Sequence, residues 1–238
     1  MFAGHFSLAL LFREWFPESS PNILCFGVAF LDIMHGLFAF VDLEGISKLP
    51  DDQAGALGPI MLRCDYTHSL VGAALLSVLY GYIATAATRR SQKSASLFFP
   101  GFVASFSHFV TDWLVHGHDL PLDPISRVIV GGTGLMETNP KAAFYLEAAL
   151  CIFGGLYSPK DLWTLVTVGS ILTMHLTSPR IMPPIYTFMV EQNDSVRPLL
   201  TGVVVPLLFA IPAVFLGYCL NRSKQQEATA SDTMKKNN

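Results

Sequence analysis

Charged residues are scarce in this chain of 238 residues. Asp, Glu, Lys and Arg make up only 14% of it, against roughly 25% in an ordinary soluble domain. Hydrophobic residues reach 51%, and the mean hydropathy is +0.45. A chain with so little charge cannot cover a globular surface with groups that face water. The composition therefore argues against a soluble globular enzyme and favours a protein embedded in a membrane.

A basic surplus and closely spaced cysteines are also missing. The net charge is −3, so the chain lacks the positive charge with which proteins hold nucleic acids, and no nucleic-acid partner is expected. The four cysteines are too far apart for a CxxC metal or redox motif. Three of them lie inside apolar stretches, which argues against a disulfide framework. The partner that the composition indicates is the lipid bilayer, while no residue pattern indicates a protein partner.

Apolar stretches of membrane-spanning length recur along the chain. About 20 predominantly apolar residues cross the hydrocarbon core as a helix. Stretches that come close to this length are residues 22–41, 67–88, 95–117, 142–158, 162–178 and 198–220. The apolar opening is shorter and predicts a helix that enters the membrane or packs across its outer edge. We therefore predict an all-α, multispanning helix bundle with about six spans plus this short N-terminal helix.

One transmembrane domain over residues 1–220 is the simplest organisation, followed by a polar tail at 221–238 that we expect to be disordered. Basic residues favour the side of Arg13, of the connection at 89–93 and of the tail, which the positive-inside rule makes cytoplasmic. A multi-pass integral membrane protein is thus expected. Nothing in the residues indicates which cellular membrane holds it.

Ionisable side chains interrupt the apolar stretches. Asp32, Asp112 and Glu147 would each cost about 2.5–3.5 kcal/mol as ions at a lipid-exposed helix centre. Six of the seven histidines also lie within or at the ends of these stretches. With Arg13 inside, all these groups fall toward the outer side of the bundle. Such residues persist where they face the bundle interior and find partners, so a site near the non-cytoplasmic side is expected.

The densest polar pattern is SHFVTDWLVHGHDLP at residues 107–121. On one helix, His108, Asp112 and His116 would follow at intervals of four, within a stripe about 80° wide. A His/Asp pair at this spacing can ligate one ion, which makes His108 with Asp112 the primary pair. His116 would lie about 12 Å from His108 along the axis. It is therefore a second-metal ligand, a proton shuttle or a group that orients a ligand.

Further ligands have to come from other helices. LDIMH places Asp32 and His35 three residues apart, and GH puts His5 beside a glycine. DYTHS gives Asp65 and His68 the same spacing, which shares a helix face if the helix begins there. Asp65 could instead cap that helix.

The order of these motifs resembles that of a known family. GHFSLAL, AFLDI, YTHSL and SHFVTDWLVHGHDLPL are similar to motifs of the membrane-bound, metal-dependent hydrolase-like proteins of the YdjM type. The likeness covers about residues 2–157, and the apolar stretches of 159–220 are extra to the family pattern. The metal ligands that the resemblance implies are His5, Asp32, His68, His108 and Asp112, with His116, Asp119 and Glu147 beside them.

A divalent-metal hydrolase is the function that these features favour. Zinc is the expected ion, a lipid-like or amphiphilic molecule is the expected substrate, and His116 or Glu147 would relay protons. A transporter or ion conduit is one alternative, because intramembrane Asp, Glu and His also build ion pathways. A non-catalytic multi-pass subunit, in which polar residues only hold helices together, is the other. His35 and His175 are interpreted as buried core histidines.

Overall fold

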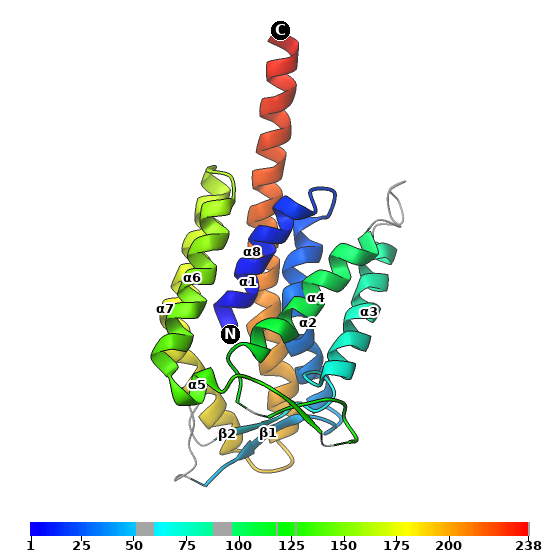
Figure 1. Cartoon of the computed structure of the whole chain (residues 1–238), viewed down its shortest axis with the longest axis vertical. Coiled ribbons are helices and arrows are strands. Elements are labelled where there is room, and N and C mark those ends of the chain that lie inside the picture. The colour runs from blue at the N-terminus through cyan, green and yellow to red at the C-terminus, as the bar shows by residue number, and fades with distance from the viewer. Residues whose placement is uncertain (51–59, 88–96, 118, 127, 238) are drawn as a thin grey trace.

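Helices make up most of the computed structural model, which describes residues 1–50, 60–87, 97–117, 119–126 and 128–237 (Figure 1). They are α1 (Phe2–Trp15), α2 (Pro21–Ala39), α3 (Leu70–Ala87), α4 (Phe98–Trp113), α5 (Leu135–Thr138), α6 (Pro140–Tyr157), α7 (Leu162–Val190) and α8 (Arg197–Asn237). The predicted helical class therefore holds for the bundle.

Two short antiparallel hairpins are added to the helices. Strand β1 (Gly45–Lys48) pairs with β2 (Ile60–Arg63), and β3 (Leu120–Pro121) pairs with β4 (Ile129–Gly131). The first hairpin lies at the end of the bundle opposite the C-terminus (Figure 1). Strands of two to four residues are too short to show a recognisable alternation of polar and apolar residues, which is why the sequence did not predict them.

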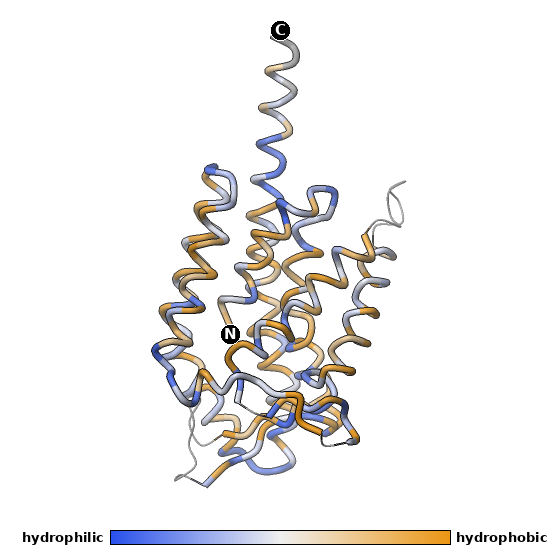
Figure 2. The backbone as a smooth tube through the Cα atoms, viewed as in Figure 1, coloured by the Kyte–Doolittle hydropathy of each residue, from blue (hydrophilic) through white to orange (hydrophobic). Residues whose placement is uncertain are grey.

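Three of the described helices are long and apolar enough to cross a membrane. They are α2, α3 and the 197–231 part of α8. Large apolar side chains remain exposed on them, with Leu75 at 65% and Ile211 at 62%, as expected of surfaces that face lipid. Hydrophilic segments gather at the two ends of the bundle (Figure 2). The chain is thus built to associate with a membrane, and the total of about six spans stays a prediction.

The C-terminal tail differs from the expected disordered segment. Helix α8 continues through it to Asn237 and projects from the bundle (Figure 1). Lys, Gln, Glu and Ala dominate the start of this extension, and all four are good helix formers, so polarity alone did not predict a coil correctly. The extension is held at its base, where Arg13 pairs with Glu227 at 2.8 Å and Lys224 Nζ donates to the Pro17 carbonyl at 2.5 Å.

Helix α2 lies at the centre of the packing, against α1, α3, α4 and α8. Its glycines allow close approach: a Cβ at Gly36 would lie 2.2 Å from Pro206 Cδ of α8, and one at Gly27 would lie 2.6 Å from Ala104 Cβ of α4. Helix α1 is buried among α2, α4, α6 and α7. Its first turn therefore lies in the interior, next to the polar residues of its neighbours.

Candidate metal centre

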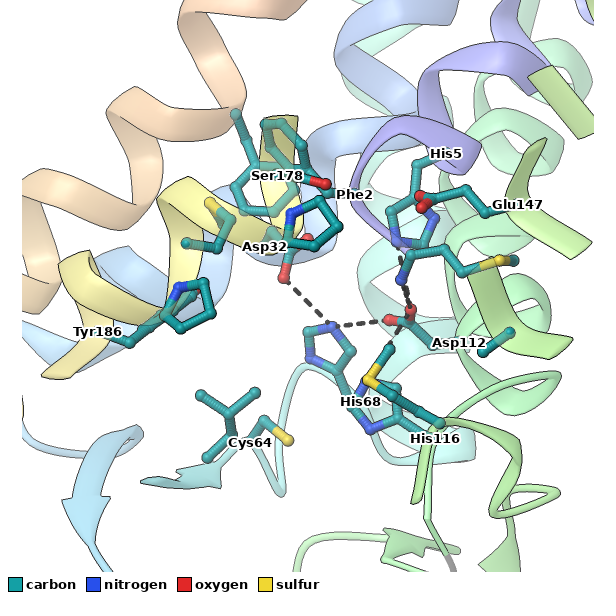
Figure 3. A pocket seen from close by; sticks show the side chains of 18 of the residues that line it. Phe2, His5, Asp32, Cys64, His68, Asp112, His116, Glu147, Ser178 and Tyr186 are labelled. Atoms are coloured by element: carbon teal, nitrogen blue, oxygen red, sulfur yellow. Dashed lines mark hydrogen bonds and ion pairs between the residues drawn. The ribbon is translucent and has the colours of Figure 1, made fainter. Parts of the chain in front are cut away.

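Five ionisable side chains from four segments converge in the interior of the bundle, and Figure 3 labels all of them except His108. They are His5 of α1, Asp32 of α2, His68 in the turn before α3, and His108 and Asp112 of α4. All are buried except Asp32, whose side chain keeps 18% of its surface exposed. The structure thus brings together every residue at which the family resemblance implies a ligand.

The spacing of the ligand atoms suits a bound ion. His108 Nε2 lies 3.1 Å from Asp112 Oδ2 and 3.2 Å from Asp32 Oδ2. His68 Nε2 lies 3.4 Å from both Asp112 Oδ2 and His108 Nε2, and 3.5 Å from Asp32 Oδ1. Two atoms that each bind one zinc ion at about 2.0–2.1 Å in a tetrahedron lie about 3.3–3.4 Å apart. The separations in the cluster are centred on this value.

Hydrogen bonds behind the rings decide which nitrogen of His108 and of His5 faces the cluster. His108 Nδ1 lies 2.7 Å from the Val28 carbonyl, which can only accept, so Nδ1 carries the hydrogen. His5 Nδ1 lies 2.8 Å from Thr111 Oγ1. Because Thr111 donates its own hydrogen to a carbonyl of α4, it accepts from His5. Each ring, when neutral, therefore directs the lone pair of Nε2 toward the cluster.

The third imidazole is fixed in the same way by a longer chain. His68 Nδ1 lies 2.7 Å from Thr67 Oγ1, and Thr67 donates to Glu44 Oε2 at 2.8 Å. His68 therefore donates through Nδ1, and its Nε2 lone pair also faces the cluster. Metal-binding histidines typically show this pattern, in which the outer ring nitrogen donates to a carboxylate, a carbonyl or another acceptor.

Three Nε2 atoms and two carboxylates directed at one centre repel one another unless positive charge lies between them. Bound metal would supply that charge, and two overlapping sets of these groups, His5 with Asp32 and His108, and His68 with His108 and Asp112, have ligand atoms within 4.8 Å of one another. Imidazole ligands suit zinc, copper, iron or nickel, whereas magnesium and calcium prefer sites made of oxygen atoms alone. The α-amino group of Met1 also lies here, 3.0 Å from Asp112 Oδ1.

His116, predicted to lie on the same helix as Asp112, lies in the turn after it. Helix α4 ends at Trp113 because the carbonyls that follow accept hydrogen bonds from another segment. The Val115 carbonyl accepts from Met136 N at 2.9 Å, and the His116 carbonyl accepts from Gly134 N at 2.7 Å. His116 Nε2 nevertheless lies 4.0 Å from Asp112 Oδ1, and its other nitrogen lies 3.6 Å from Asp119. The predicted stripe is therefore wrong at its third member, although His116 still lines the same cavity.

Glu147, the other predicted catalytic residue, has a partner for each carboxylate oxygen. Oε1 accepts from the Gly4 backbone N–H at 2.9 Å, and Oε2 lies 2.9 Å from His175 Nδ1. His175 is 2% exposed, and its Nε2 has no partner among the described residues. Glu147 thus connects α6 to α1 and α7, and its role as a proton relay stays a prediction.

Glu44 is a buried carboxylate that the sequence did not single out. It is 1% exposed, lies 3.1 Å from His35 Nδ1, and accepts from the backbone N–H groups of Tyr66 and Thr67 at 2.7 Å. Burial alone would raise the pKa of Glu44, but the hydrogen bonds from His35 and Thr67 hold it below its usual value. Its partners lie in other segments, so no local motif marks it.

Asp65 neither shares a helix face with His68 nor caps α3. Helix α3 begins at Leu70, and the Oγ of Ser69 accepts from Gly72 N at 3.1 Å. Asp65 is exposed in the preceding turn. His68 reaches the cluster from that turn, where its backbone N–H donates to the Cys64 carbonyl at 2.9 Å.

A cavity of about 420 Å³ opens beside the cluster (Figure 3). One part of its wall carries four of the five cluster residues, without His108, together with His116 and Glu147. Another part is apolar and includes Phe2, Phe144, Met182 and Phe209. The described residues that line it include neither Lys nor Arg. The cavity therefore joins a polar wall that carries three carboxylates to an apolar one.

No protein-family model, no curated protein and no solved structure matches the chain. The resemblance to YdjM-type proteins therefore stays an expectation drawn from the motifs. The geometry of the cluster has to support any function by itself.

Proposed function

We propose that the protein is a multi-pass membrane hydrolase that holds a divalent metal ion, with zinc as the expected ion, near the non-cytoplasmic side. The observation that carries the proposal is the convergence of three histidine Nε2 atoms and two aspartates beside a largely apolar cavity. The hydrogen bonds behind each imidazole support it, because they orient the lone pairs before any ion binds.

The residues divide into ligands and supporting groups. His68, His108, Asp32 and Asp112 would hold the ion, which would supply a Lewis acid that polarises the bond to be cleaved and acidifies a water molecule. His116 is 19% exposed at the cavity wall, and a proton can pass there between the cavity and Asp119. Glu147 holds the first turn of α1, and with it His5, against the cluster.

The substrate class follows from the two kinds of wall. An apolar chain would pack against Phe144, Met182 and Phe209 while a polar head reaches the aspartates. Pro179 and Pro183 of α7 also line the cavity. An amphiphile with its hydrolysable bond at the junction of head and chain fits this arrangement best.

An ion conduit is supported less well. A conduit needs polar groups that continue from the cluster toward the Arg13 end of α1. Between the cluster and Arg13, the described residues Leu10, Leu24 and Cys25 are fully buried in the hydrophobic core and offer no continuous path of ion ligands.

Metal content tests the proposal directly. Detergent-purified wild type should contain bound metal in stoichiometric amount, and Asp112→Ala and His108→Ala should lose it. Ser105→Ala is the matched control, because it removes a buried polar group of α4 that bonds to Ser77 outside the cluster. Wild type without metal, or Asp112→Ala with a full complement, would contradict the proposal.

Catalysis needs a separate measurement. Metal-loaded protein should hydrolyse at least one class in a panel of amphiphilic carboxylic and phosphoric esters, and chelation should stop the reaction. Metal flux into proteoliposomes without hydrolysis would instead favour the conduit. Bound metal with neither hydrolysis nor metal flux would favour the non-catalytic membrane subunit.

A further inference from the structure

The two carboxylate oxygens of Asp112 face two different sets of nitrogen atoms. Oδ2 lies 3.1 Å from His108 Nε2 and 3.4 Å from His68 Nε2. Oδ1 lies 3.2 Å from His5 Nε2 and 4.0 Å from His116 Nε2. A carboxylate with nitrogen ligands beside each oxygen has the arrangement that bridges two cations.

Ring stacking separates the two sets. The imidazoles of His5 and His108 are stacked, with centroids 3.7 Å apart and planes within 9° of parallel. An imidazole binds a metal in the plane of its ring, because the nitrogen lone pair lies in that plane. Stacked rings cannot approach closer than about 3.5 Å. An ion in the plane of one ring therefore lies at least about 3.5 Å from the nitrogen atoms of the other ring, which is well beyond the zinc–nitrogen bond length of about 2.0–2.1 Å.

His5 and His108 therefore cannot serve the same ion. Proximity alone would let His5, Asp32 and His108 share one, since their ligand atoms lie within 4.8 Å of one another. The parallel rings exclude that set. The remaining set of His68, His108 and Asp112 has no such conflict, because the rings of His68 and His108 are inclined by 68°.

We propose that the site binds two divalent cations bridged by Asp112. The first would be held by His68, His108, Asp32 and Oδ2 of Asp112. The second would be held by His5 and Oδ1, with His116 moving in from its position 4.0 Å from Oδ1. The separation of the stacked rings, 3.7 Å, matches the distance of about 3.5–4 Å between the ions of two-metal hydrolytic sites. The inference rests on the proposed function, extends its single ion to a pair, and gives His116 the role of a ligand in place of that of a proton relay.

The amino group of Met1 is the competitor for the second position. It lies 3.0 Å from Asp112 Oδ1, on the same side as His5. This side of the carboxylate thus accommodates positive charge, either as an ammonium group or as a metal ion. If the ammonium group stays, the chain binds one ion only, and the proposal is wrong.

Counting bound ions in the metal-stripped, detergent-purified full chain tests the proposal. Titration with zinc alone should load two ions per wild-type chain and one per His116→Ala chain. His116 is partly exposed, so its replacement is compatible with folding. His5→Ala should also bind one, whereas Ser105→Ala, which removes a buried hydroxyl of α4 outside the cluster, should still bind two.

Electron paramagnetic resonance with manganese provides the second readout. Full loading of the wild type should give the spectrum of two exchange-coupled Mn²⁺ ions, and His116→Ala should give the six-line signal of an isolated one. If the wild type bound one ion per chain and His108→Ala bound none, the two-ion proposal would be wrong and the proposed function would stand. No ion in the wild type would overturn both.

Discussion

Glu147 of α6 accepts a hydrogen bond from the backbone N–H of Gly4 in α1 at 2.9 Å, across 143 positions of sequence. The N–H groups of a first helical turn have no partner within their own helix and carry partial positive charge, so a carboxylate there is stabilising. Gly4 allows the approach, because a Cβ at this position would lie 3.3 Å from Glu147 Cγ. His5 is the next residue, so its place in the cluster depends on this contact.

Replacing Glu147 by alanine should destabilise the protein and weaken metal binding. The variant leaves two buried donors, Gly4 N and His175 Nδ1, without their acceptor, at a cost of about 1–3 kcal/mol each. Thermal unfolding in detergent measures the loss. Glu147→Gln retains an acceptor oxygen and should recover most of the stability. If Glu147→Ala unfolded at the same temperature as wild type, this carboxylate would not hold α1.

Thr67 is expected to control metal affinity without binding metal. Its hydroxyl accepts from His68 Nδ1 and donates to Glu44, so Thr67→Val removes both bonds at nearly constant volume. Loss of such outer partners typically weakens metal binding 10–100-fold, that is, by about one to two orders of magnitude. Competition with a chelating dye measures the affinity.

Thr67→Ser is the control for the threonine prediction. It keeps the hydroxyl and should bind zinc with an affinity close to that of wild type. Equal affinity in Thr67→Val would show that the orientation of His68 does not depend on this hydrogen-bond chain.

Helical periodicity accounts for the part of the site that the sequence predicted. His108 and Asp112 are one turn apart within α4, so any helix through them places both side chains on one face. The same reasoning failed for His116, because the helix ends at Trp113, after which backbone carbonyls accept hydrogen bonds from residues 134–136. A local spacing rule cannot include this long-range competition for hydrogen bonds.

The groups that the sequence missed all act through distant partners. Glu44 lies in a loop between apolar stretches and acquires its role only when the chain brings it to His35 and Thr67. His175 was interpreted as a core histidine, and its contact with Glu147 depends on the packing of α7 against α6. Motif order predicted which residues to suspect, whereas tertiary packing determined how they are oriented.

A side chain at Gly36 should disrupt the contact between α2 and α8. Its Cβ would lie 2.2 Å from Pro206 Cδ, and a rigid proline ring cannot move aside without shifting α8. Gly36→Val should therefore lower the free energy of unfolding by about 1–3 kcal/mol, the usual cost of overpacking. Gly169→Ala in α7 is the matched control, since nothing lies within 4 Å of the position that its Cβ would take. It should be neutral or gain up to about 1 kcal/mol from helix propensity.

Asp161 should give α7 a stability that depends on pH. It is the N-cap of the helix, accepts from Trp163 N at 2.9 Å and Thr164 N at 3.1 Å, and binds Ser223 of α8. Partial burial would raise the pKa of Asp161, but the hydrogen bonds from Ser223 and Thr164 lower it below the usual 3.8. The folded protein thus favours the carboxylate, and the resulting stability is present above that pH and is lost as the pH falls.

At neutral pH, Asp161→Ala should cost about 1 kcal/mol, the typical loss of an N-cap. The difference in free energy of unfolding between this variant and wild type should decrease as the pH falls through 3.8 and below, because protonation removes the charge that the hydrogen bonds favour. Asp161→Asn keeps an N-cap acceptor that does not titrate, so it should be only slightly less stable than wild type and approach it at low pH. Chemical unfolding in detergent between pH 7 and pH 3 or so compares the three proteins. A difference in free energy of unfolding that stays constant with pH would mean that the charge of Asp161 does not contribute to the cap. A difference that increases on acidification would contradict the pH dependence derived from the lowered pKa.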